Sequence, residues 1–171
     1  MSIVTKKGDG GKTKLFSGET VSKADPVLNI VGTIDELIAC LGLARSLATH
    51  KELALEIRFL QIDLMKLASD FSKKTRTMED HVPKIEKKIS ELEGEIKLPG
   101  SFLIPGATPC SSALELSRTI CRRLERDAVA ALEAKMFEGG ADHIYMNRLS
   151  DYLFLLARQA EKLAGVPFDA A

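Results

Sequence analysis

Apolar residues recur at helical spacing along most of the chain beyond residue 25. Between residues 26 and 46 they fall three or four positions apart, and Pro26 suits the first turn of a helix. The same period continues over about 52–70, where the apolar face is typical of a core helix. Over about 82–96 one narrow apolar stripe stands among charged residues, which predicts a helix at the surface.

Two further helices are expected in the second half of the chain. The fourth spans about 111–135, and either Ser111 or Ser112 can cap its beginning. The fifth spans about 143–163 and is followed by a glycine and a proline, which are stop signals. No coherent strand pattern follows the first 25 residues. The sequence therefore predicts an all-α fold, a five-helix antiparallel bundle with short connections.

The first 25 residues are polar and interrupted by glycines, which predicts a loop or a short hairpin. Glycine-rich loops bring backbone N–H groups close to phosphate oxygens, although the same composition also suits an unstructured tail. Lys6 stands where a P-loop has its first glycine, and Thr13 stands where the dinucleotide fingerprint has its third, so neither motif is present. We expect residues 1–25 to form part of one domain with the bundle of residues 26–171.

The stretch ELSRTICRRLER, residues 115–126, sets arginines and glutamates into a helical pattern. At 3.6 residues per turn, Arg118, Arg122 and Glu125 share one face, and Arg126 lies beside them. The apolar residues of the stretch fall on another face: Leu116, Ile120 and Leu124. A solvated amphipathic helix is the ordinary interpretation. Crowded arginines repel one another, however, and their planar donor groups suit phosphate, so we favour an anion-binding helix.

Three single residues stand out by their surroundings. Asp35 lies within an apolar helical sequence and needs either a partner or exposure to water, because burying an unpaired carboxylate is unfavourable. Asn147, on the fifth helix, can hydrogen-bond either a ligand or a neighbouring helix. Phe102 lies between two Pro-Gly turns in LPGSFLIPGATP, where a buried anchor is the favoured interpretation and an aromatic pressed on a ligand is the alternative.

Composition limits the class of protein. With 171 residues, of which 45% are hydrophobic, the chain is long enough for one full core. Lys plus Arg and Asp plus Glu both number 24, so the formal net charge of zero argues against nucleic-acid binding. No apolar run approaches the ~18 residues of a membrane span, and no signal peptide is evident. We therefore expect a cytoplasmic protein that does not enter a membrane.

Cysteine and histidine spacing argues against several kinds of chemistry. Cys40, Cys110 and Cys121 are odd in number and form no CxxC pair, so we expect reduced thiols. The histidines show no HxxxH or ExxH pairing, which argues against a preformed transition-metal site. No serine or cysteine has the sequence context of a catalytic nucleophile, so covalent catalysis is not expected.

Four separated motifs together resemble those of one family. They are TKKGDGGKTKLFSG followed by Lys23, VGTIDEL at 31–37, FLIPG followed by SRTICRRLER, and NRLSDYLF at 147–154. In this order the chain is similar to the trimeric, propanediol-utilisation (PduO) type of ATP:cob(I)alamin adenosyltransferase. The resemblance covers nearly the whole chain, with minor departures, such as Ala107 in place of a second glycine and the absence of an extended C-terminal tail.

The resemblance implies a ferritin-like, cobalamin adenosyltransferase-like bundle that forms a homotrimer with ATP held between subunits. Reduced cobalt of the corrinoid would attack the 5′-carbon of ATP, which gives adenosylcobalamin and releases triphosphate. Mg²⁺ would be held mainly through the ATP phosphates. A cob(II)alamin reductase and an adenosylcobalamin-dependent enzyme would be further partners.

The resemblance also implies site residues. The N-terminal loop would hold the phosphates with Thr5, Lys6, Lys7, Gly8, Asp9, Gly10, Gly11, Lys12, Thr13, Lys14 and Lys23. The helices would complete the nucleotide site with Arg122, Arg123, Glu125, Arg126 and Asn147. Asp35 and Arg118 match a pair that forms a salt bridge between subunits. Phe102 matches the aromatic that displaces the lower axial ligand of the corrinoid, and with Arg122 these residues form the catalytic set.

Two other classes stay open on the same sequence. A non-catalytic nucleotide-binding or corrinoid-delivery module could use the same bundle. A purely structural helical oligomer would leave the glycine-rich loop and the arginine crowding unexplained. The absence of a protein nucleophile does not argue against the enzyme. Displacement of triphosphate from carbon requires positioning and charge stabilisation rather than a protein nucleophile.

Overall fold

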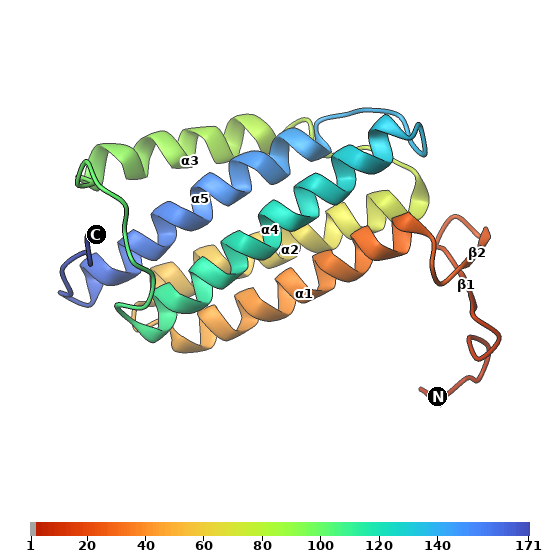
Figure 1. Cartoon of the computed structure of the whole chain (residues 1–171), viewed down its shortest axis with the longest axis horizontal. Helices are drawn as coiled ribbons and strands as arrows, with labels where there is room; N and C mark the ends of the chain where they lie inside the picture. Colours follow the sequence, from red (N-terminus) through yellow and green to blue (C-terminus); the bar gives the residue numbers. More distant parts are fainter. Residues whose placement is uncertain (1–2) are drawn as a thin grey trace.

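A computed structural model describes residues 3–171, which fold into five long helices preceded by a small hairpin (Figure 1). The elements are β1 Lys12–Lys14, β2 Thr20–Ser22, α1 Pro26–Leu47, α2 Lys51–Lys73, α3 His81–Glu95, α4 Pro109–Glu133 and α5 Asp142–Leu163. Successive helices run in opposite directions, so the antiparallel five-helix bundle predicted from the sequence is confirmed (Figure 1). The expected hairpin is also present, as β1 pairs antiparallel with β2.

The core lies between α1, α2, α4 and α5. α4 packs against both α5 and α1, while α1 also packs against α2 and α3 lies against α5. α3 itself buries only Ile85 and Leu92, in agreement with its predicted place at the surface. Each of the other helices contributes fully buried residues, among them Ile34, Leu37, Leu41, Ile57, Leu64, Leu67, Leu114, Cys121, Leu124, Leu149, Leu153 and Leu156.

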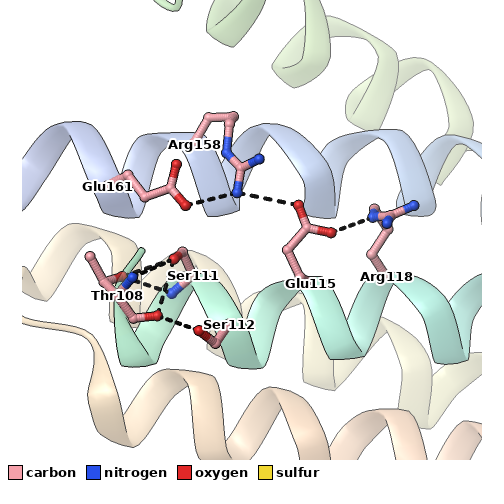
Figure 2. Close-up of polar contacts among 7 residues, drawn as sticks. All are labelled: Thr108, Ser111, Ser112, Glu115, Arg118, Arg158 and Glu161. Carbon is pink, nitrogen blue, oxygen red and sulfur yellow. Dashed lines mark hydrogen bonds and ion pairs between the residues drawn. The ribbon is translucent and has the colours of Figure 1, made fainter. Parts of the chain in front are cut away.

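The beginning of α4 differs from the sequence prediction. Thr108, rather than Ser111 or Ser112, is the N-cap, because Pro109 already has the backbone angle of the first helical position. Thr108 Oγ1 accepts a hydrogen bond from Ser111 N at 3.0 Å, and Ser111 Oγ accepts one from Thr108 N at 3.1 Å (Figure 2). This reciprocal capping satisfies two backbone donors and places the start of α4 two residues earlier than expected.

The apolar residues of the arginine stretch are not equally buried. Leu116 is 54% exposed, whereas Leu124 is fully buried and Ile120 is half-buried. The reason is that α4 is covered on two sides, by α1 and by α5, and it meets them largely through small residues such as Ser117 and Cys121. A single apolar stripe was therefore too simple a description of this helix.

α1 is more apolar than the sequence analysis allowed. It has an 18-residue window with a mean hydropathy of 1.7 and is the one helix among the described residues that is long and apolar enough to cross a membrane. In the fold, Ile30, Ile34 and Leu37 pack into the core between α2 and α4. Only 39% of that window is buried, so the outer face of α1 is also largely apolar.

Asp142, the first residue of α5, is buried beside the guanidinium group of Arg76. Arg76 Nε lies 3.2 Å from its Oδ2, and the Arg76 guanidinium lies over the Phe137 ring at 4.8 Å. Burial raises the pKa of the Asp142 carboxyl more than the positive charge of Arg76 lowers it, and nearby acids, including Asp70, raise this pKa as well. Together they raise the pKa of the Asp142 carboxyl from 3.8 to about 6.

This raised pKa predicts a pH-dependent stability. The folded state binds the Asp142 proton more tightly than the unfolded chain does, so this contribution is full below about pH 4 and is lost as pH rises through about 6. Asp142→Asn should leave the free energy of unfolding near pH 4 unchanged and raise it above pH 7 by up to about 3 kcal/mol. Urea unfolding of both proteins at the two pH values measures this, and a pH-independent difference would contradict it.

Candidate functional site

The arginine face predicted from the sequence is formed on α4. Arg118 and Arg122 line a cleft of about 490 Å³ between α3, α4 and α5. Arg122 also borders a second hollow of about 360 Å³ together with Glu125 and Arg126. Within residues 3–171, no carboxylate lies within ion-pair distance of Arg122 or Arg126. These two guanidinium groups are therefore available to an anion.

Asn147 joins α5 to this face. Its Nδ2 donates a hydrogen bond to Glu125 Oε1 at 3.0 Å, so the contact seen in the single chain is with a neighbouring helix. Arg148 donates to Asn147 Oδ1 at 2.8 Å and also pairs with Glu86 of α3 at 2.9 Å. These contacts orient Glu125 and Asn147 beside the free arginines, and they were not evident from the sequence.

Arg118 is held by a buried charge network (Figure 2). Arg118 Nε lies 2.6 Å from Glu115 Oε2, and the other oxygen of Glu115 lies 3.3 Å from Arg158. Arg158 also pairs with Glu161 at 2.8 Å. Sequence reasoning missed Arg158, although an arginine among the leucines and alanines of the inward face of α5 was a signal for a compensated buried charge.

Asp35 does not meet Arg118 within one chain. Asp35 is exposed on the outer face of α1, so the alternative of an exposed acid describes the isolated subunit. Its neighbour Glu36 pairs with Arg123, which places Arg123 beside a different groove, between α1 and α4. The carried-over residues therefore form separate groups in one subunit rather than one continuous site.

The N-terminal loop forms a compact unit with Lys23. In the hairpin, Lys12 pairs with Ser22, and Lys23 N donates to Gly11 O at 2.9 Å. Gly8 lies so close to the Lys23 side chain that a Cβ there would be 2.8 Å from Nζ. The loop and Lys23 thus lie side by side, and a side chain at residue 8 would displace the flexible end of the Lys23 side chain.

This loop lies at one end of the bundle, beyond the start of α1 (Figure 1). It is tied to α2 by a hydrogen bond from Ser17 N to Ser72 O at 3.0 Å and by the ion pair of Glu19 with Lys74 at 2.6 Å. No hydrogen bond or ion pair in the described chain joins residues 5–14 to the arginine face. One subunit therefore presents two separate halves of the expected nucleotide site.

Phe102 is 90% exposed, so the favoured interpretation of a buried anchor is wrong. The two Pro-Gly turns hold a short apolar segment in which Leu103 is half-buried and Phe102 faces solvent. Leu98, in the same α3–α4 connection, lines the cleft that contains Arg118 and Arg122. An exposed aromatic close in sequence to a lining residue of this cleft fits the alternative, an aromatic that meets a ligand.

The fold and the site define a class of protein. A helical bundle with an unpaired arginine in a cleft, a second one in an adjoining hollow, an exposed aromatic and a glycine- and lysine-rich loop is suited to bind a polyphosphate together with an apolar partner. The cleft also has apolar lining, including Ile89, Phe154 and Leu155.

Comparisons with known proteins narrow this class. Residues 3–160 match the family model for cobalamin adenosyltransferase. Corrinoid adenosyltransferase MMAB of Mus musculus is 34% identical over 95% of this chain and 74% of that protein. Corrinoid adenosyltransferase of Bacillus subtilis is 33% identical over 97% of this chain and 90% of that protein. The chain belongs to the cobalamin adenosyltransferase family, as its motifs indicated.

A solved structure gives the same result for the fold. A variant PduO-type ATP:corrinoid adenosyltransferase from Lactobacillus reuteri, complexed with cobalamin and ATP, is similar with a TM-score of 0.90 and 30% identity. The similarity covers 99% of this chain and 96% of that chain. The whole bundle, including the N-terminal loop, is therefore shared with a protein that binds both ligands.

The exposure of Phe102 predicts that its truncation leaves stability intact. Phe102→Ala should leave the melting temperature within about a degree of the unsubstituted protein, since an exposed side chain contributes little to burial. Phe71→Ala is the matched control, because Phe71 is 2% exposed and its loss should cost about 3–5 kcal/mol. Calorimetry of both variants measures this, and a similar drop in both would return Phe102 to the core.

Proposed function

We propose that this protein transfers the 5′-deoxyadenosyl group of ATP to the cobalt of cob(I)alamin. The Co–C bond forms with the electron pair of cobalt(I), while the bond from the 5′-carbon to oxygen breaks and its electron pair leaves with triphosphate. The observation that carries this proposal is a pair of arginines on α4 that have no carboxylate partner among the described residues. Arg122 borders both the cleft between α3, α4 and α5 and the second hollow, and Arg126 borders the second hollow.

The arginine face would act on the leaving group. Negative charge builds up on the triphosphate as the bond breaks, and fixed guanidinium donors stabilise such charge without reorganisation. Glu125 and Asn147 already hold each other in place and would orient the nucleoside end of ATP. Mg²⁺ would arrive with the phosphates, since the described residues contain no group of three metal-ligating side chains.

The corrinoid would occupy the cleft between α3, α4 and α5. Its walls combine apolar residues such as Phe154 with the guanidinium groups of Arg118 and Arg122. Phe102 would approach the lower face of the corrinoid and take the place of the axial ligand. Four-coordinate cobalt would then be easier to reduce, as the family resemblance implies.

The complete site would form in a homotrimer. The loop of residues 5–14 and the arginine face stay apart in one chain, so ATP would be held between the loop of one subunit and α4 of its neighbour. The apolar outer face of α1, with exposed Leu43 and Leu47, favours burial against another subunit. On this surface Asp35 would meet Arg118 of the next subunit.

Further partners follow from the chemistry. Cobalt must be reduced to cob(I)alamin before the transfer, which requires a reductase, and the product suits an adenosylcobalamin-dependent enzyme. The three cysteines are free and buried, which fits a reducing compartment, and we place the enzyme in the cytoplasm. Formation of the Co–C bond on addition of ATP, followed by the change in the corrinoid absorption spectrum, tests the whole proposal. Binding of both ligands without this change would favour a non-catalytic module.

Arg122→Ala should lower turnover by about 10²–10³-fold, because a donor aimed at developing charge has an effect of this size. Its fold should persist, since the side chain is exposed. Arg58→Ala, which removes another exposed arginine, on α2, is the matched control and should keep full turnover. Steady-state kinetics at saturating ATP and circular dichroism measure both effects, and near-normal turnover of Arg122→Ala would remove this residue from the site.

Asp35→Asn should weaken the assembly and the activity together. If Asp35 pairs with Arg118 across a subunit boundary, the substitution leaves a buried guanidinium less well compensated, an effect of about 3–5 kcal/mol for a fully buried pair. Analytical ultracentrifugation and turnover should therefore change in parallel as the protein is diluted. If Asp35→Asn sediments like the unsubstituted protein and keeps full activity, the pair of Asp35 and Arg118 is exposed or not formed.

A further inference from the structure

The last residues of the described chain pair with the loop that carries Phe102. After α5, Gly165 adopts a positive φ of 68° and turns the chain back toward the α3–α4 connection (Figure 1). Ile104 N then donates to Asp169 O at 2.7 Å, and Ala171 N donates to Phe102 O at 2.9 Å. Leu103 and Ala170 form an antiparallel bridge between these two bonds. We call residues 168–171 the strap.

The strap provides the backbone hydrogen bonds of this loop. Among the described residues, 97–107 make no other backbone hydrogen bond with a separate segment. The Phe102 side chain is 90% exposed and has little packing of its own, so its position is set by its backbone. That backbone is in turn fixed by the carbonyl of Phe102 and by the N–H of Ile104, both of which bond the strap.

The strap is itself anchored on the bundle. Phe168 is half-buried against the core, and its ring centre lies 6.0 Å from the guanidinium carbon of Arg158. Arg158 is 1% exposed and is paired with Glu115, which also holds Arg118. The strap therefore connects the Phe102 loop to the same charge network that supports Arg118.

We propose that the strap is a positioning element that holds Phe102 in the geometry required for adenosyl transfer. This inference rests on the proposed function, because it assigns Phe102 to the reacting corrinoid. The groups that hold the loop are backbone atoms, namely the N–H of Ala171 and the carbonyl of Asp169. Any residue with a backbone N–H at position 171 can therefore make the same hydrogen bond. A displacement of a reacting group by about 1 Å can lower the rate by about 10²-fold, so a loosened loop should have a measurable effect.

Proline at position 171 isolates the relevant hydrogen bond. Ala171→Pro removes the N–H that donates to Phe102 O, and it favours the extended conformation at residue 170 that the bridge already requires. Ala171→Ser keeps the N–H and is the matched control. We expect Ala171→Pro to lower turnover about 10-fold with an unchanged KM for ATP and an unchanged melting temperature, and to speed amide exchange at Ile104. Ala171→Ser should behave as the unsubstituted protein.

A double-mutant cycle separates positioning of Phe102 from general loosening. If the strap acts through Phe102, Ala171→Pro should have no further effect on turnover in a Phe102→Ala background. If the two substitutions lower turnover independently, so that their losses multiply in the double variant, the proposal is wrong. It is also wrong if Ala171→Pro and Ala171→Ser have equal turnover while the unsubstituted protein is active. Failure of the unsubstituted protein to form the Co–C bond would instead reject the proposed function. Amide exchange at Ile104 would still show whether the strap holds the loop, because that measurement does not depend on activity.

Discussion

The structure depends on compensating one buried positive charge between α4 and α5. Arg158 is 1% exposed, and Glu115 on α4 and Glu161 on its own helix approach it at 3.3 and 2.8 Å. Removing one partner of a buried ion pair typically costs about 3–5 kcal/mol, so the two helices are strongly favoured in a single register. That register places Asn147 of α5 opposite Glu125 of α4, and it leaves Arg118 and Arg122 facing the cleft.

The two-sided burial of α4 explains how one helix serves both core and site. Its small residues pack against α1 and α5, while its remaining face carries the arginines that border the cleft. The N-terminal loop lies apart from the arginine face within one chain, because it is tied to the end of α2 through Ser17 and Ser72. The proposed homotrimer would bring the loop of a second subunit to each arginine face.

Phe102 shows where sequence reasoning is weak. An apolar residue between two turns is ordinarily a candidate for burial, and nothing local distinguishes Phe102 from Leu103. The structure buries part of Leu103 and exposes Phe102, because the bridge between Leu103 and Ala170 fixes which side of the segment faces the bundle. Leu103 and Ala170 are far apart in the sequence, and they decide the outcome through backbone atoms that carry no sequence signal.

The sequence by itself determined the number, order and approximate bounds of the helices, since apolar period and capping residues are local properties. It also determined that Arg118, Arg122 and Glu125 share a face, which follows from helical geometry alone. Only the tertiary structure decided that Thr108 caps α4, that Leu116 is exposed and that Asn147 bonds Glu125. These features depend on which helices lie side by side, and packing between distant segments is not encoded in any local pattern.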